Sequence, residues 1–131
     1  MKIEHIAIWT EDLEGLTQFY ESYFGGTRNN KYTNSEKQFE SYFVSFDSGC
    51  RLEIMKMPTV PGTNNNPYDQ FTGIIHFAFE MENQRAIDEK TTELKNAGFE
   101  VLDGPRVTGD GYYESVILDP DKNRVELTCV V

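Results

Sequence analysis

The sequence predicts an α+β fold in which two β-α-β-β-β modules with pseudo-twofold symmetry form a curved sheet. The first observation is that the chain's two histidines occupy the same place in near-copies of one apolar strand, residues 3–8 and 74–79. The second is that each copy is followed, 48 and 50 residues after its histidine, by a strand-like segment with a central glutamate. The third is a segment rich in proline and asparagine between the copies. A repeat near 70 residues is too long for a solenoid unit, which favours one pseudo-symmetric domain.

The first module covers residues 1–57. Its helix is predicted because apolar residues recur at three- and four-residue steps from Leu13, and because Thr10 or Asp12 can cap its start. Gly25 and Gly26 end it, since glycine accepts the left-handed conformation of a helix stop. The expected elements are a strand over 2–9, the helix over 13–24, a weak strand and loop over 28–37, and strands near 39–47 and 50–57.

A linker over residues 58–72 separates the modules, because its prolines and asparagine run do not suit a central strand or a helix. The second module, residues 73–131, repeats the plan. Its expected elements are a strand over 73–80, a helix over 83–97, a short strand over 99–102, a glycine-rich loop over 104–111, and strands over 112–118 and 123–130. The whole chain, residues 1–131, is thus predicted to form a single domain.

Composition narrows the classes of partner. The net charge of −10, with no run of lysine or arginine, argues against nucleic acids and anionic membranes, because both require a basic surface. The sequence contains no apolar run of 18 residues, so we expect no membrane-spanning helix. It also lacks a basic segment followed by an apolar one at the start, so we expect no signal peptide. Cys50 and Cys129 lie in expected strands and are interpreted as reduced, buried residues. We therefore expect a cytoplasmic protein that binds a small molecule.

Alternation of side chains along the strands separates two faces of the predicted sheets. One face is almost wholly apolar and is expected to pack on the helices: Ile6, Ile8, Leu52, Ile54, Ile75, Phe77, Phe79, Val125, Leu127 and Cys129. The other face is mixed: Ile3, His5, Ala7, Trp9, Arg51, Glu53, Met55, Met57, Ile74, His76, Ala78, Glu80, Arg124, Glu126 and Thr128. Inward-facing polar groups are costly unless they are paired or bind something.

Four residues of the mixed face are candidate metal ligands: His5, Glu53, His76 and Glu126. A single strand histidine is usually a structural residue, and a single strand glutamate usually faces solvent. Here the same two residue types recur at equivalent positions of both copies. Two imidazoles and two carboxylates that converge on one point form a divalent-metal site.

The double β-α-β-β-β pattern with its His…Glu…His…Glu order resembles the vicinal oxygen chelate superfamily, and within it glyoxalase I. The resemblance extends over essentially the whole chain. Its most specific parts are the opening strand IEHIAI (residues 3–8), the helix end FYESYFGG (19–26) and the closing run LDPDKNRVEL (118–127). The closing run is similar to the superfamily's Asp-Pro-Asp-Gly-Asn turn and last ligand strand, with Lys122 where glycine is usual.

The resemblance implies one divalent ion, Ni²⁺, Co²⁺ or Zn²⁺, with Zn²⁺ or Ni²⁺ favoured, in an octahedral site with two waters. Extradiol dioxygenases bind iron with two histidines and one carboxylate, so Glu53 would block a position that oxygen chemistry needs. Bleomycin-binding members generally lack the metal ligands. The implied activity is that of a glyoxalase I-like lyase or isomerase acting on a methylglyoxal–thiol hemithioacetal. Either Glu53 or Glu126 is the implied catalytic base, and Glu126 is slightly favoured.

Two positions depart from glyoxalases that use glutathione. Trp9 stands where those enzymes carry an arginine, and Met57 stands where they tend to have asparagine. Both departures argue against a glutathione site.

Five side chains are predicted to line the substrate cavity: Trp9, Arg51, Met55, Arg124 and Tyr112. Tyr112 belongs to the segment 108–113, whose glycines suit a lid, although a plain hairpin explains it nearly as well. The two arginines either hold an acidic substrate or act as structural counter-charges for the glutamates beside them.

Two further functions stay open from the sequence. One is an epimerase or thiol transferase acting on another small molecule, and the other is a non-catalytic small-molecule binding or resistance protein. A homodimer is expected, because exposed edge strands invite pairing and because the resemblance implies it. The metal site forms within one chain or across that dimer.

Overall fold

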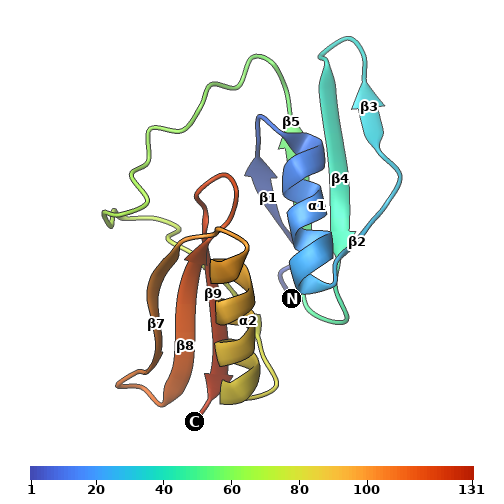
Figure 1. Cartoon of the computed structure of the whole chain (residues 1–131). Coiled ribbons are helices and arrows are strands. Elements are labelled where there is room, and N and C mark those ends of the chain that lie inside the picture. Colours follow the sequence, from blue (N-terminus) through green and yellow to red (C-terminus); the bar gives the residue numbers. More distant parts are fainter. The chain divides into compact units, whose positions relative to one another are not determined.

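One helix packs on one sheet in each half of the chain. The computed structural model describes residues 1–131, which divide into two units, Met1–Asn64 and Asn65–Val131. The division falls inside the predicted linker 58–72, which holds no helix or strand. In Figure 1, α1 lies against the sheet of the first unit and α2 lies against the sheet of the second. The predicted α+β class, with two modules of the same plan, is confirmed.

The first unit contains a five-stranded sheet in the order β1-β5-β4-β2, with β3 paired to β4. Its elements are β1 (His5–Trp9), α1 (Leu13–Phe24), β2 (Thr27–Arg28), β3 (Tyr32–Asn34), β4 (Phe39–Ser45) and β5 (Arg51–Lys56). β1 runs parallel to β5, and the other pairings are antiparallel.

The second unit repeats the order with four strands, β6-β9-β8-β7. Its elements are β6 (Phe77–Glu80), α2 (Gln84–Asn96), β7 (Val101–Val107), β8 (Tyr112–Leu118) and β9 (Arg124–Val130). β6 runs parallel to β9, as β1 does to β5. Neither helix is long and apolar enough to cross a membrane.

The first helix begins and ends where the sequence predicts. The Asp12 carboxylate accepts a hydrogen bond from the Gly15 amide at 3.0 Å, and the Thr10 hydroxyl accepts one from the Asp12 amide at 3.0 Å. Both candidate capping residues therefore contribute to the start of α1. Gly25 closes the helix with φ 68°, a conformation that glycine adopts without a Cβ penalty.

The apolar sheet faces pack on the helices. In the first unit Leu16 and Tyr20 of α1 are buried with Leu52 and Ile54 of β5. The corresponding residues of the second unit are Ile87, Leu94, Ile117, Val125 and Leu127, each fully buried. Burying a side chain of this size stabilises the fold by about 1.5–3 kcal/mol. The opposite face of each sheet carries no helix. Along the central strands β5 and β9 the residues of this face are mostly partly exposed, and along the edge strands β1 and β6 they are mostly exposed.

The first strand of each module is shorter than predicted, so His5 is the first residue of β1 and His76 lies just before β6. β1 starts at His5 and β6 at Phe77, so the predicted starts at residues 2 and 73 are wrong. Ile75 was expected under a helix, yet it is 37% exposed, and Ile74 is 92% exposed. The reason is geometric: apolar character predicts a strand, but a strand extends only as far as it is paired. The pairing begins at His5 with Arg51 in the first unit and at Phe77 with Val125 in the second.

The strand β7 is longer than predicted, because residues 104–107 belong to it rather than to a loop. Gly104 and Pro105 suggested a break, but β7 is an edge strand, where proline's missing N–H costs no ladder bond. The register against β8 shifts around Gly104. A Cβ at Gly104 would lie 2.5 Å from the Glu114 carbonyl oxygen, so this close approach requires glycine.

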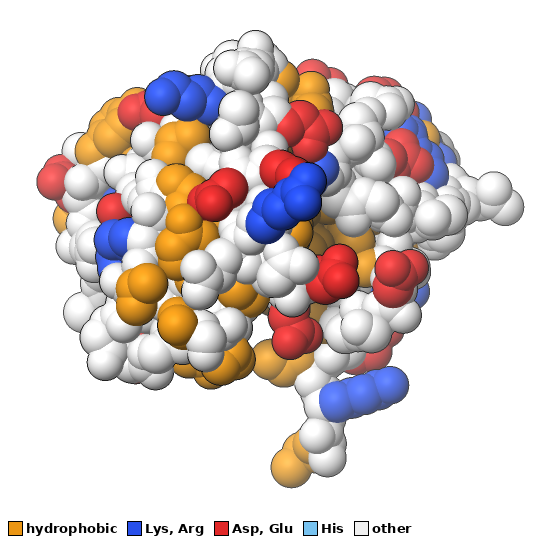
Figure 2. Space-filling model, turned by 60° about the horizontal axis from the view of Figure 1, so that its bottom comes forward, with side chains coloured by type: hydrophobic (Ala, Val, Ile, Leu, Met, Phe, Trp, Pro, Cys, Tyr) orange, Lys and Arg blue, Asp and Glu red, His pale blue; other side chains and the backbone are white.

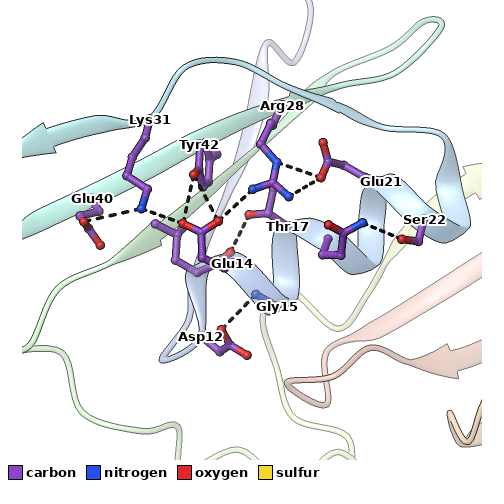
Figure 3. Close-up of polar contacts among 12 residues, drawn as sticks. Asp12, Glu14, Gly15, Thr17, Glu21, Ser22, Arg28, Lys31, Glu40 and Tyr42 are labelled. Carbon is purple, nitrogen blue, oxygen red and sulfur yellow. Dashed lines mark hydrogen bonds and ion pairs between the residues drawn. The ribbon is translucent and has the colours of Figure 1, made fainter.

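A charged network ties α1 to β2 and β4 in the first unit (Figure 3). The Arg28 guanidinium donates to the carboxylates of Glu21 and Glu14 and lies 4.8 Å from the centre of the Tyr42 ring. Tyr42 donates its hydroxyl to Glu14 at 3.0 Å, and Lys31 pairs with the same carboxylate. Hydrogen bonding from Arg28 lowers the pKa of Glu21, and bonding from Lys31, Tyr42 and Arg28 lowers the pKa of Glu14.

The second half of the linker is held to the second unit. Arg124, at the start of β9, donates from Nε to the Pro67 carbonyl oxygen at 2.9 Å and from Nη2 to the Asp69 carbonyl oxygen at 3.2 Å. Tyr68 donates its hydroxyl to Glu100 at 2.8 Å. These bonds hold residues 67–69, in the segment that precedes His76, against the second unit, although this segment forms no helix or strand.

We predict that Arg28→Met lowers the free energy of unfolding by about 1–2 kcal/mol near pH 7, because two carboxylates lose their shared donor. Glu14 and Glu21 have lowered pKa values in the folded protein. Their contribution is therefore present above about pH 4.5, the ordinary glutamate value, and is lost as the pH falls through the folded pKa values. Urea unfolding at several pH values measures both effects.

Arg85→Met is the matched control for this experiment. Arg85 pairs only with Glu89 on an exposed face of α2, so its loss should leave the free energy of unfolding nearly unchanged. Equal costs for the two substitutions, or a difference that does not shrink in acid, would contradict the network's role.

Arg124→Gln is expected to release the linker's second half. The Tyr68 and Asp69 amides, which bond to Asn66, should then exchange with solvent about tenfold faster in hydrogen-exchange measurements. Arg106→Gln, on the far edge of the same sheet, is the control and should leave those amides unchanged. Unaltered exchange in Arg124→Gln would show that the segment is held by other contacts.

Candidate metal centre

The parallel strand pairs bring each histidine beside the glutamate of its own module. In the first unit Ala7 lies opposite Glu53, and in the second Ala78 lies opposite Glu126. His5 precedes Ala7 by two residues within β1, so it shares that face of the sheet. His76 lies just before β6, and its imidazole also reaches the glutamate of its module. The alanine's small side chain leaves the space between imidazole and carboxylate open.

Both pairs have the separation of two ligands on one ion. His5 Nε2 lies 3.6 Å from Glu53 Oε2, and His76 Nε2 lies 3.3 Å from Glu126 Oε2. Two donors at about 2.1 Å from a common ion are about 3.0 Å apart at octahedral angles and about 3.4 Å apart at tetrahedral angles. The His76–Glu126 distance lies within this range and the His5–Glu53 distance is slightly longer, so the residues present fit a divalent metal after a small approach of His5 and Glu53. No group of three His, Cys, Asp or Glu side chains comes together, so the four-ligand centre stays a prediction.

The pair in the second unit opens onto a cavity of about 360 Å³. Its lining residues are His76, Asp110, Tyr112, Glu114, Glu126 and Thr128. The Glu126 side chain is only 12% exposed, and burial raises the pKa of its carboxyl, while His76 acts in the opposite direction and Glu114 and Asp110 raise it further. A carboxylate with poor hydration and acidic neighbours favours a bound cation.

The pair in the first unit lies among aromatic side chains. The Phe43 ring meets the His5 imidazole edge-on at 5.4 Å, and the Phe39 ring meets Trp9 in the same way at 5.9 Å. The Tyr32 ring also contacts Phe39, with the ring centres 6.0 Å apart. The two open sheet faces therefore differ in chemistry, with aromatic rings on one and carboxylates and hydroxyls on the other. Figure 2 shows that the acidic side chains on one side of the molecule lie in several separate places, with basic and neutral groups between them.

The five predicted cavity residues have different surroundings. Tyr112 lines the cavity beside His76 and Glu126. Trp9 and Met55 lie opposite one another on β1 and β5, and Trp9 is 42% exposed. Arg51 pairs with Glu4, and Arg124 bonds to the linker carbonyls. The interpretation of both arginines as counter-charges for Glu53 and Glu126 is wrong, because each guanidinium is directed to other acceptors.

Two cavity residues were not singled out from the sequence. Glu114 lies opposite Thr128 in the β8–β9 pairing, on the same face as Tyr112. Because side chains alternate along a strand, the predicted strand 112–118 puts Glu114 on the same face as Tyr112, so this periodicity is the signal that identifies it. Asp110 lies in the preceding turn, where no periodicity predicts its direction.

The turn before β9 sets the place of Glu126. The buried Asp119 carboxylate accepts from the amides of Asp121 and Asn123, both at 2.9 Å, and from the Asn123 side chain at 2.8 Å. Lys122 has φ 67°, which explains why glycine suits this position. The register from Leu118 opposite Arg124 onward follows from this turn.

Comparison with known proteins gives the family. Residues 2–127 match the model of the Glyoxalase/Bleomycin resistance protein/Dioxygenase superfamily. The chain is 27% identical over 128 residues to the uncharacterized protein YqjT of Bacillus subtilis (strain 168), covering 95% of this chain and 96% of that protein.

Solved structures share the fold. A glyoxalase family protein from Enterococcus faecalis is 25% identical with a TM-score of 0.76, over 98% of this chain and 97% of the other. The trypanothione-dependent glyoxalase I of Leishmania major is 19% identical with a TM-score of 0.77, over 97% and 85%. At this identity the second likeness concerns the fold alone. With the family model matched along nearly its whole length, the chain belongs to the Glyoxalase/Bleomycin resistance protein/Dioxygenase superfamily.

Proposed function

We propose that this protein is a divalent-metal-dependent lyase or isomerase of glyoxalase I type, acting on the hemithioacetal of methylglyoxal and a thiol. The observation that carries the proposal is the duplicated His–Glu pair, with its donor atoms at chelating separations of 3.6 and 3.3 Å. The proposed ligands are His5, Glu53, His76 and Glu126, and the proposed ion is Ni²⁺, Co²⁺ or Zn²⁺. A bound ion of this kind would act as a Lewis acid toward the two neighbouring substrate oxygens.

A glutamate carboxylate is the proposed base that transfers the proton. One carboxylate takes the proton from the carbon that bears the sulfur and returns it to the adjacent carbonyl carbon. The hydroxyl proton of the first carbon passes to the oxygen of the second, so the hemithioacetal becomes a thioester of a 2-hydroxy acid with no net gain or loss of atoms. Glu126 is the better candidate, because burial raises the pKa of its carboxyl and makes it the stronger base. The hydroxyl groups of Tyr112 and Thr128 line the same cavity and can bond to substrate oxygens.

The thiol is proposed to differ from glutathione. Trp9 occupies the position of the arginine that holds the glutathione carboxylate in similar enzymes, and it stands among the aromatic rings of Phe39 and Tyr32. This aromatic surface favours a substrate with an apolar portion. It also supports the second candidate function, an epimerase or thiol transferase acting on another small molecule, for which the same metal ligands would serve.

A cytoplasmic homodimer is part of the proposal. β1 and β6 lie at the edges of their sheets, where unpaired backbone groups are available to a second copy. Analytical ultracentrifugation of the purified protein tests this directly. A monomer at every concentration would overturn the proposed dimer, and any four-ligand centre would then have to form within one chain.

Metal binding is the first prediction of this function. Titration of chelator-treated protein with Zn²⁺ or Ni²⁺ should show a saturable site, and Glu53→Gln and Glu126→Gln should each weaken binding at least about tenfold. Glu89→Gln, on the exposed face of α2, is the control and should bind as the unaltered protein does. An unaltered protein without affinity for any of the three ions would remove the enzymatic proposal.

Catalysis is the second prediction. Metal-loaded protein should form a thioester from methylglyoxal and at least one small thiol, observed by ultraviolet absorbance, and a chelator should abolish the reaction. Glu126→Gln should lower kcat by about 100-fold or more, because the base is lost. If Glu53→Gln lowers kcat far more than Glu126→Gln at saturating metal, the roles of the two glutamates are reversed. Failure with every thiol tested would favour the second candidate function.

A further inference from the structure

We propose that Glu4, held in place by Arg51, is a positioning residue that orients His5 and makes Nε2 its metal-binding nitrogen. This inference rests on the proposed metal site. Glu4 immediately precedes β1, and its carboxylate turns to the histidine that follows it.

The hydrogen bond to Glu4 assigns the proton on the His5 ring. His5 Nδ1 lies 2.5 Å from Glu4 Oε2. An ionised carboxylate can only accept hydrogen bonds, so Nδ1 is the ring nitrogen that carries the hydrogen. Nε2 then keeps its lone pair, and it is the nitrogen that lies 3.6 Å from Glu53. Metal-bound histidines commonly hold their other ring nitrogen in this way.

The two oxygens of Glu4 are shared between two donors. Oε2 faces His5, whereas Oε1 accepts from Arg51 Nε at 2.7 Å and also contacts Nη2. The Arg51 amide donates to the Glu4 carbonyl oxygen at 3.0 Å, so backbone and side chain both join these residues. Arg51 therefore restricts the rotation of the carboxylate that restricts His5.

The Phe43 ring contacts both Arg51 and His5, the two residues that Glu4 joins. The Arg51 guanidinium lies 4.0 Å from the centre of the Phe43 ring, and the His5 imidazole meets that ring at 5.4 Å with an interplanar angle of 89°. Phe43 lies opposite Glu53 in the β4–β5 pairing, so it stands beside the proposed ligand carboxylate as well. The Glu4 bond and the Phe43 contact both favour the orientation of the imidazole that presents Nε2 to Glu53.

The second unit lacks this arrangement at the matched positions. Ile75 stands where Glu4 does, immediately before the histidine, and it offers no acceptor. Arg124 stands where Arg51 does, but it donates to the carbonyl oxygens of Pro67 and Asp69. His5 and His76 occupy equivalent positions of the repeat, but only His5 has a glutamate immediately before it. His76 therefore serves as an internal control.

The test is ¹⁵N-histidine NMR on metal-free protein, at a pH high enough that the ring shifts no longer change. The unaltered protein should show His5 predominantly as the Nδ1–H tautomer, and Glu4→Ala should convert it to a mixture while the His76 signals stay unchanged. Glu4→Gln, whose amide oxygen still accepts a hydrogen bond, should retain much of the tautomer preference. Ile75→Ala is the matched control and should leave His5 unaltered.

The second readout is Zn²⁺ affinity, for which Glu4→Ala should show a loss of about 10- to 100-fold, with Glu4→Gln intermediate. Glu4 is exposed, so the variant is expected to fold, and its amide spectrum verifies this. Unchanged tautomers in Glu4→Ala, or unchanged Zn²⁺ affinity in a variant whose tautomers have changed, would overturn the inference. If the unaltered protein binds no Zn²⁺, the same comparison is made with Ni²⁺ and Co²⁺, and absence of binding of all three ions would instead overturn the proposed function.

Discussion

Parallel pairing between the first and last strands of each module is the constraint on which the rest of the structure depends. The pairing places Ala7 opposite Glu53 and Ala78 opposite Glu126, which sets each histidine beside its glutamate. Because side chains alternate, a slip of one residue would turn the glutamate toward the helix and the apolar residues toward solvent. Burial of Leu52, Ile54, Val125 and Leu127 under the helices therefore fixes the register and, with it, the geometry of the proposed ligands.

The repeat is a property of the backbone more than of the side-chain environment. Each unit orders its strands in the same way, and each brings one imidazole to within 3.6 Å of one carboxylate. The side chains that surround the His–Glu pair differ between the two units. His5 is supported by Glu4, Arg51 and Phe43. The pKa of Glu126 is raised, first by burial of its carboxyl and then by the neighbouring carboxylates of Glu114 and Asp110. The two halves of the proposed site are thus chemically unequal, which suits a reaction that needs one carboxylate to be the stronger base.

Sequence reasoning was most accurate where short-range rules dominate. The helix α1 was predicted over its observed bounds, because capping by Asp12, periodic burial and Gly25 agree. It was less accurate at the strands that begin each module, since the end of a strand depends on the length of its partner. The segment 104–107 shows the same dependence, because its place in β7 follows from pairing with β8 and not from its own composition. Arg51 and Arg124 were placed on the correct strands, but their partners, Glu4 and the linker carbonyls, lie 47 to 57 residues away along the chain.

The sequence by itself determined the duplicated plan, the face of each strand and the four candidate ligands, because periodicity and residue type are local properties. Only the tertiary structure decided what surrounds those ligands: the carboxylate on His5, the cavity at Glu126 and the acceptors of the two arginines. The physical reason is that side chains several bonds long reach any acceptor within about 6 Å of the backbone, and the choice among these acceptors is made by packing. A repeat in sequence therefore predicts equivalent positions, and packing decides whether they are equivalent in chemistry.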